Sequence, residues 1–171
     1  IRMPRLIIGL LVGGALALAG AVMQGVFSNP LADPGIMGVS AGASLGAVIA
    51  IALGVTSLGM FYMPAFAFVG AFVSVGITII LTLRNNKLDT TTLLLAGVAV
   101  SMLLGAFTSG ILTMINEYRL REFLFWMVGG LDFRRWDHVV LAVGPIVTGS
   151  VILMMLGRHL NVLVLGDTEA R

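Results

Sequence analysis

Long stretches of this chain carry no charged side chain, and this most constrains its fold. No Asp, Glu, Lys or Arg occurs over residues 34–83, and further gaps cover 6–32, 90–116 and 138–157. A charge at the centre of a bilayer costs about 2.5–3.5 kcal/mol on insertion scales, so such gaps are typical of membrane-spanning segments. Only 11% of the 171 residues are charged, against about 25% in soluble domains. The sequence therefore predicts a membrane protein.

Five stretches approach the roughly 20 apolar residues that a membrane helix needs. They cover residues 6–27, 36–53, 65–83, 93–115 and 139–157. The charge-free run over 34–83 is too long for one span, so we expect it to break at 54–59. The predicted fold is all-α: a polytopic transmembrane helical bundle with about five spans, forming part of one transmembrane domain over 1–171.

Small residues recur every fourth position in two of these spans. The first span carries Gly9, Gly13, Ala17, Ala21 and Gly25, and the fourth carries Gly97, Ser101, Gly105 and Ser109. In lipid, such stripes let helix backbones approach closely, and they could also line a pathway.

The connections between the spans differ in character. Residues 28–35 contain two prolines and cannot be continuous helix. Residues 116–137 contain an apolar stretch at 123–128, too short to cross and accompanied by Trp126 and Trp136, which predicts a short interfacial helix. After the fifth span the chain becomes amphipathic, and a helix start at Asp167 is reasonable.

The basic residues do not follow the positive-inside rule. If the 84–89 connection is cytoplasmic, four basic residues lie inside and six outside, which by itself favours the opposite orientation. Exposed arginines that dock a partner would explain this excess. Arg2 and Arg5 form a compact basic pair at the start of the first span, which suits either an interfacial anchor or a docking point for a partner's carboxylates.

Motifs of catalysis are scarce. Residues 38–42 (GVSAG) match the nucleophile elbow of serine hydrolases, but that motif needs a preceding strand, and small residues at a helix start explain the match. There is no nucleotide-binding P-loop, metal-binding H-E-x-x-H or cysteine. We expect no enzyme activity, no metal, no cofactor bound by this chain and no nucleic-acid partner, because the ten basic residues are scattered through loops.

Several segments together resemble the FecCD family of ABC importer permeases. They run in the family's order along essentially the whole chain: residues 4–25, 29–40 (NPLADPGIMGVS), 93–99 (LLLAGVA), 126–130 (WMVGG), and 160–171 (LNVLVLGDTEAR). Family permeases have about ten spans, and this chain is similar to spans two to six. We therefore expect it to be a fragment of a longer protein, and we predict that it does not fold alone.

The resemblance implies roles for particular residues. The pair Arg2 and Arg5 would face the periplasm and contact glutamates of a substrate-binding protein. A cytoplasmic gate would include Asn29, Leu31, Thr90 and Thr91, although helix capping also accounts for Asn29, Thr90 and Thr91. Residues 160–171 would begin the contact with the ATPase, through Leu165, Gly166, Asp167 and Ala170. Further candidates for the outer surface are Arg119, Arg121, Arg134 and Arg135.

The same resemblance implies the function and the partners. The chain would belong to an ATP-driven importer of iron-siderophore, haem or cobalamin complexes in the bacterial inner membrane, and these cargoes share the motifs. Its partners would be a second permease copy, most simply as a homodimer, ATP-binding subunits that use the ATP, a periplasmic or lipid-anchored binding protein, and membrane lipid. The kinked connection at 28–35 leaves an ion-coupled secondary transporter with broken helices as an alternative, and an intramembrane serine hydrolase is a remote one.

Overall fold

The structure is a computed structural model that describes residues 2–84, 87–88 and 90–164, with side chains described for residues 2–83 and 90–157. This part of the chain is almost entirely helical, which confirms the predicted all-α fold. Its α-helices are α1 (Arg2–Phe27), α2 (Val39–Leu53), α3 (Tyr62–Thr82), α4 (Thr90–Met114), α5 (Glu117–Val128) and α6 (Trp136–Val164). Two short 3-10 helices, η1 (Pro34–Met37) and η2 (Val55–Leu58), and the paired two-residue strands β1 (Leu83–Arg84) and β2 (Lys87–Leu88) complete it.

Four of the described helices are long and apolar enough to cross a membrane. They are α1, α3, α4 and the part of α6 over Trp136–Gly157. The fifth apolar helix, α2, has 15 residues and is therefore about 22 Å long, shorter than the ~30 Å hydrocarbon core. It begins at Val39 rather than at residue 36, because Gly38 adopts a left-handed conformation (φ 81°) that interrupts the helix between η1 and α2.

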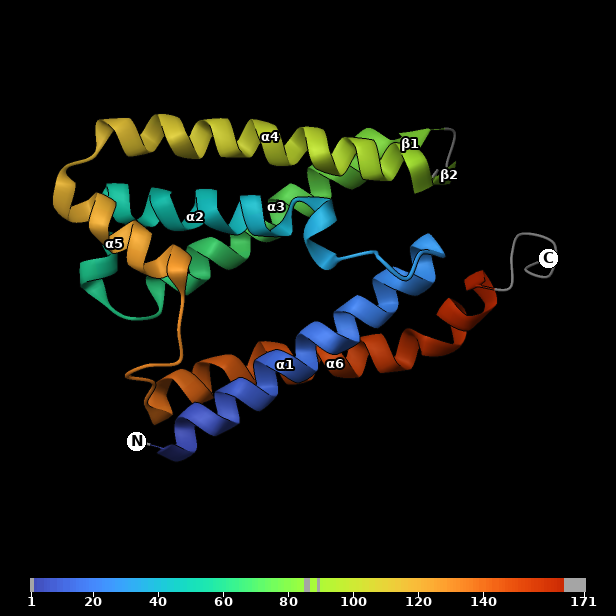
Figure 1. Cartoon of the computed structure of the whole chain (residues 1–171), viewed down its shortest axis with the longest axis horizontal. Helices are drawn as coiled ribbons and strands as arrows, with labels where there is room; N and C mark the ends of the chain where they lie inside the picture. Colours follow the sequence, from blue (N-terminus) through green and yellow to red (C-terminus); the bar gives the residue numbers. More distant parts are fainter. Residues whose placement is uncertain (1, 85–86, 89, 165–171) are drawn as a thin grey trace. The chain divides into compact units, whose positions relative to one another are not determined.

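The chain divides into two compact units. Unit 1 contains α1 and α6, from Ile1–Pro34 and Gly130–Arg171, and unit 2 comprises Gly35–Gly129 with α2 to α5. In unit 1, α1 and α6 begin at the same end and run side by side in the same direction (Figure 1). In unit 2, α3 runs antiparallel to α2 and α4, and these three helices all contact one another (Figure 1).

Direct backbone contact joins α2 and α3. A side-chain carbon added at Gly42 or at Gly70 would overlap the carbonyl oxygen of the other residue, and one added at Gly46 would overlap the carbonyl oxygen of Phe66. Three glycines therefore allow the backbones of α2 and α3 to touch, as expected where small residues meet in lipid. The stripe predicted in the fourth span is involved through Gly97, where an added carbon would overlap the carbonyl oxygen of Ile36.

Buried hydroxyl groups reinforce the start of α2. Ser74 and Thr78, both on α3 and fully buried, donate hydrogen bonds to the carbonyl oxygens of Gly38 at 2.8 Å and Met37 at 3.2 Å. Thr82, one turn further along, donates to the carbonyl oxygen of Thr78 at 2.7 Å. The Gly38 carbonyl oxygen also accepts the Gly42 amide at 2.9 Å, so the Ser74 and Thr78 hydroxyls add bonds from α3 to the carbonyl groups at the start of α2.

The helix α5 covers the far end of α2. It starts at Glu117, earlier than the predicted stretch at 123–128, because the Asn116 side chain caps it by accepting a hydrogen bond from the Arg119 amide at 3.0 Å. Phe123 is fully buried and packs with Val48 and Ile51 of α2. A short helix therefore contains the predicted stretch and packs on α2 through Phe123, and its interfacial location stays a prediction.

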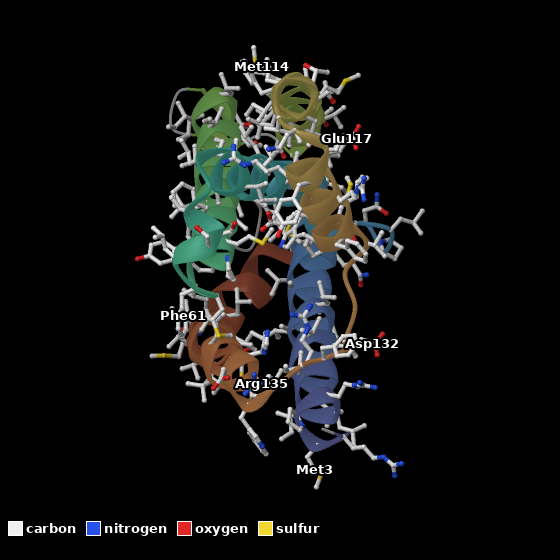
Figure 2. The ribbon with its side chains drawn as sticks, turned by 90° about the vertical axis from the view of Figure 1, so that its left-hand side faces the viewer. Met3, Phe61, Met114, Glu117, Asp132 and Arg135 are labelled. Atoms are coloured by element: carbon white, nitrogen blue, oxygen red, sulfur yellow. The ribbon has the colours of Figure 1, made fainter. Side chains whose placement is uncertain are left out.

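The helices of unit 1 leave most of their apolar surface uncovered. Only 6% of the most apolar window of either α1 or α6 is buried. Side chains such as Leu10 on α1 and Met155 on α6 are more than 70% exposed, and Figure 2 shows Met3 pointing away from the ribbon. Such surface requires lipid or further protein. The apolar part of α6 ends at Gly157, as predicted for the fifth span, and the helix itself continues to Val164.

Candidate functional site

Four arginines lie near the end of unit 1 at which both of its helices begin. Arg2 and Arg5 occupy the first turns of α1, and Arg134 and Arg135 lie directly before α6. We call these four residues the arginine cluster. Figure 2 is viewed from the side on which this end lies, with Met3, Asp132 and Arg135 labelled.

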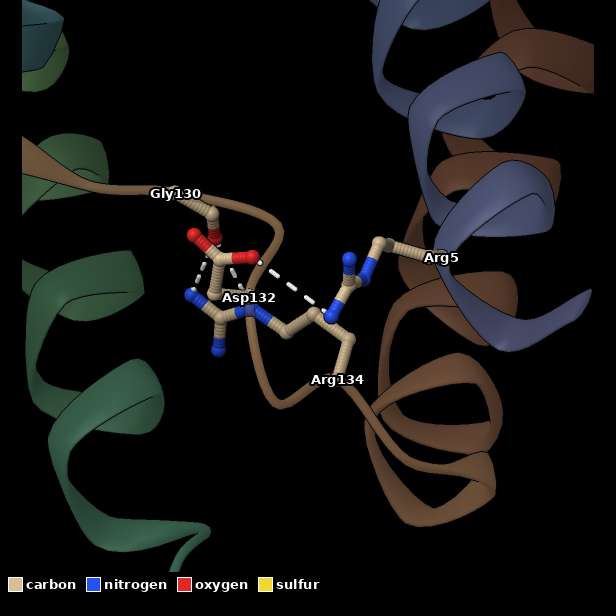
Figure 3. Close-up of polar contacts among 4 residues, drawn as sticks. All are labelled: Arg5, Gly130, Asp132 and Arg134. Carbon is tan, nitrogen blue, oxygen red and sulfur yellow. Dashed lines mark hydrogen bonds and ion pairs between the residues drawn. The ribbon is translucent and has the colours of Figure 1, made fainter. Parts of the chain in front are cut away.

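Arg5 makes an ion pair with Asp132, which lies in the segment between α5 and α6. The Arg5 Nη2 atom is 3.5 Å from Asp132 Oδ1, and the two side chains are 40% and 78% exposed (Figure 3). The Arg5 Nε atom is buried and has no hydrogen-bond partner among the described residues. The contact is therefore a single long interaction rather than the bidentate pairing that makes arginine–carboxylate contacts strong.

Arg134 braces the segment that carries Asp132. Its Nε and Nη2 atoms both donate to the carbonyl oxygen of Gly130, at 3.0 and 2.9 Å (Figure 3). The segment turns sharply, with positive φ angles at Gly130 (147°) and Phe133 (58°). Asp132 is thus held on a short loop that is closed by its own hydrogen bonds.

A depression of about 270 Å³ adjoins the arginine cluster. It is lined by Pro4, Arg134, Arg135, Trp136 and Asp137. The Arg135 Nε atom lies 4.0 Å from Asp137 Oδ2, and both side chains are well exposed. The sequence analysis named all four arginines, with Arg2 and Arg5 as the docking pair and Arg134 and Arg135 as further candidates. The structure adds Asp132 beside Arg5, which sequence spacing could not associate with it.

The predicted gate residues fall in different units. Asn29 and Leu31 follow α1 in unit 1, where the Asn29 Oδ1 atom accepts a hydrogen bond from the Leu31 amide at 2.9 Å and Leu31 is 85% exposed. Thr90 and Thr91 form the exposed first turn of α4 in unit 2. Asn29 therefore stabilises its own turn, and the gate stays a prediction. The predicted ATPase contact residues Leu165, Gly166, Asp167 and Ala170 lie outside the described residues.

Two other arginines have distinct surroundings in unit 2. Arg119 is half-buried, and its Nη1 atom donates to the carbonyl oxygen of Ala52 at 2.9 Å. Arg121 is exposed and pairs with Glu117 one turn earlier at 3.3 Å. Arg119 thus joins α5 to α2 and differs from the surface arginine that the sequence alone suggested.

The surroundings of Ser40 differ from those of a hydrolase nucleophile. Ser40 is exposed in the first turn of α2, and the residues before it form the 3-10 helix η1 rather than the strand that an elbow requires. Within the described ranges, no group of three or more His, Cys, Asp or Glu residues could hold a metal ion.

Comparison with known proteins gives consistent matches along the chain. The FecCD transport family model matches residues 1–171. The cobalamin import system permease protein of Halobacterium salinarum is 44% identical over 99% of this chain and 45% of its own length. The hemin transport system permease protein of Yersinia pestis is 42% identical over 99% of this chain and 52% of its own length.

A solved structure has the same fold. It is described as an inward-facing conformation of a metal-chelate type ABC transporter, with a TM-score of 0.88 and 30% identity over 99% of this chain and 54% of that chain. The chain spans about half the length of the curated relatives it matches. Its apolar helices and its relatives make it a multi-pass membrane protein, and the chain belongs to the FecCD transport family.

Proposed function

We propose that this chain forms part of the membrane-spanning permease of an ATP-driven importer for iron-siderophore, haem or cobalamin complexes. The observation that carries the proposal is the whole-chain match, in sequence and in fold, to permeases whose names refer to cobalamin and hemin and to a metal-chelate type transporter. The importer would work in the bacterial inner membrane.

The energy source would lie in other subunits. This chain would bind no cofactor, and separate ATP-binding subunits would hydrolyse ATP and press on the segment after α6. A second copy of the permease would complete the pathway, most simply as a homodimer. Nucleotide-driven movement of the helices as rigid bodies would then alternate access between the two sides.

The two ends of unit 1 would have different tasks. At one end, Arg2 and Arg5 would receive acidic residues of a substrate-binding protein, because guanidinium groups recognise carboxylates strongly. At the other end, the turn with Asn29 and Leu31 would contribute to a cytoplasmic gate together with Thr90 and Thr91. The binding protein would supply the affinity for the cargo, so the pathway itself need not bind it tightly.

The test is uptake into proteoliposomes. The permease that contains this chain is reconstituted with its ATP-binding subunits and its substrate-binding protein, and uptake of labelled cobalamin, haem and a ferric siderophore is compared. Uptake should require ATP hydrolysis and stop with vanadate, and an ionophore that collapses ion gradients should leave it unchanged. Uptake that survives vanadate but is lost with the ionophore would instead establish an ion-coupled secondary transporter.

A further inference from the structure

The Arg5 guanidinium, a proposed contact for the binding protein, already faces a carboxylate of its own chain. The Asp132 Oδ1 atom lies 3.5 Å from the Arg5 Nη2 atom, and Figure 3 marks this ion pair with a dashed line. An acidic residue arriving from a partner must therefore approach a guanidinium whose charge is partly balanced. We propose that Asp132 is an internal competitor for the acidic residue of the substrate-binding protein, and that docking displaces it from Arg5. This inference rests on the docking role of Arg5 in the proposed function.

The contact is weak enough to be displaced. It consists of one N···O approach at 3.5 Å, whereas a strong arginine–carboxylate pair has two parallel bonds of about 2.7–2.9 Å. Asp132 is 78% exposed, so water competes for its oxygens.

Displacement need not unfold the loop. Arg134 closes the loop through two hydrogen bonds to the Gly130 carbonyl oxygen, and neither bond involves Asp132 or Arg5. Asp132 can therefore separate from Arg5 while the backbone around it stays in place. The loop presents the competing carboxylate, and Arg134 maintains the loop.

The competitor lowers affinity in a way that suits a transport cycle. Its negative charge weakens the local positive potential that draws in an acidic partner, and the new pair forms only at the expense of the old one. A binding protein that must dock and dissociate in every cycle is released more easily when its affinity is moderate. Asp132 assists the release because it pairs with the Arg5 guanidinium again as the partner dissociates.

The test measures the dissociation constant of the substrate-binding protein for the reconstituted transporter in low-salt buffer. Asp132→Asn should tighten binding about two- to fivefold, which corresponds to the range for exposed ion pairs. Asp132→Ala should do the same, which covers the case of an Asn amide that still accepts a bond from Arg5. The gain should shrink as salt screens the charges.

The matched control is Asp137→Asn, which removes the same charge beside the same arginine cluster but from the Arg135 contact. It should tighten binding less than the Asp132 variants do. In the Arg5→Ala background, Asp132→Asn should give no gain in affinity, because the arginine for which Asp132 competes is absent.

Other outcomes overturn the proposal in distinguishable ways. Weaker binding with Asp132→Asn means that Asp132 orients Arg5 for docking, and equal gains from the Asp132 and Asp137 variants mean a general charge effect. If Arg5→Ala alone leaves binding unchanged, Arg5 does not dock the binding protein, and the proposal that Asp132 competes for Arg5 is also wrong. An importer that still takes up its cargo in that case retains the proposed function.

Discussion

Arg119 donates a hydrogen bond of 2.9 Å to the carbonyl oxygen of Ala52, at the end of α2. The last four carbonyl groups of a helix have no partner within it, and Ala52 is the last residue but one of α2. A guanidinium at this position also interacts favourably with the negative end of the helix dipole. Arg119 therefore provides a polar attachment of α5 to α2, beside the apolar contact of Phe123.

Replacing Arg119 should weaken the attachment of α5 to α2. We expect Arg119→Ala to lower the free energy of unfolding by about 1–3 kcal/mol, because a half-buried acceptor loses a charged donor. Arg121→Ala is the matched control on the same helix, since its exposed pair with Glu117 should change stability by less than about 0.5 kcal/mol. Thermal unfolding of the purified permease in detergent measures both, and equal melting temperatures for the two variants would contradict the polar attachment of α5 to α2.

Glycine at position 70 should be essential for the distance between α2 and α3. Gly70→Ala places a carbon against the Gly42 carbonyl oxygen and should cost about 1–3 kcal/mol by overpacking. Gly76→Ala, also in α3, meets nothing within 4 Å and should be neutral or stabilise by about 0.5–1 kcal/mol through helix propensity. Melting temperatures that shift in opposite directions would agree with the contact, and a harmless Gly70→Ala would refute it.

The buried hydroxyl of Thr78 should stabilise the start of α2. Thr78→Val keeps the shape of the side chain but removes the hydroxyl proton that the Met37 carbonyl oxygen at 3.2 Å shares with the Ser74 carbonyl oxygen at 3.0 Å, at a cost of about 1 kcal/mol. Thr148→Val in α6 is the control, because its hydroxyl bonds only to carbonyls of its own helix and is exposed. A larger loss of melting temperature for Thr148→Val than for Thr78→Val would argue against this role.

The turn after α1 yields a test of the proposed gate. Asn29→Ala removes the acceptor of the Leu31 amide, whereas Asn29→Asp keeps an oxygen in that position. If the turn keeps the pathway closed, Asn29→Ala should raise ATP-independent leak of cargo from loaded vesicles about fivefold, which equals roughly 1 kcal/mol. Asn29→Asp should leak like the unmodified protein, and the reverse order of leak would count against the gate.

The helical elements could be predicted from sequence because lipid offers so few alternatives. A backbone in hydrocarbon must satisfy its own hydrogen bonds, so an apolar stretch without charge becomes a helix. The ends of the helices were harder to predict, since they depend on single residues: Gly38 delays α2 to Val39, and the cap at Asn116 starts α5 at Glu117. Both are residue types with known local preferences, since glycine readily adopts left-handed conformations and asparagine is a common helix N-cap.

Contacts between distant residues could not be predicted in the same way. Ala52 and Arg119 are 67 residues apart in sequence, and the Arg5 pair with Asp132 links the first helix to a loop far along the chain. The small-residue spacing was noticed in the first and fourth spans, yet in α2 and α3 it is Gly42, Gly46 and Gly70 that meet a neighbouring backbone. Periodicity shows that a helix face consists of small residues, but only the packed structure shows which of these faces contacts a neighbouring helix.

The glycine contact between α2 and α3 has one further consequence. Where side chains separate two helices, rotamer changes allow the distance between the helix axes to vary with temperature and with the thickness of the surrounding bilayer. Between Gly42 and Gly70 no side chain intervenes, so direct van der Waals contact of the two backbones sets the spacing. The distance between α2 and α3 at this pair should therefore stay constant. Movement of other parts of the protein during a transport cycle can be measured relative to it.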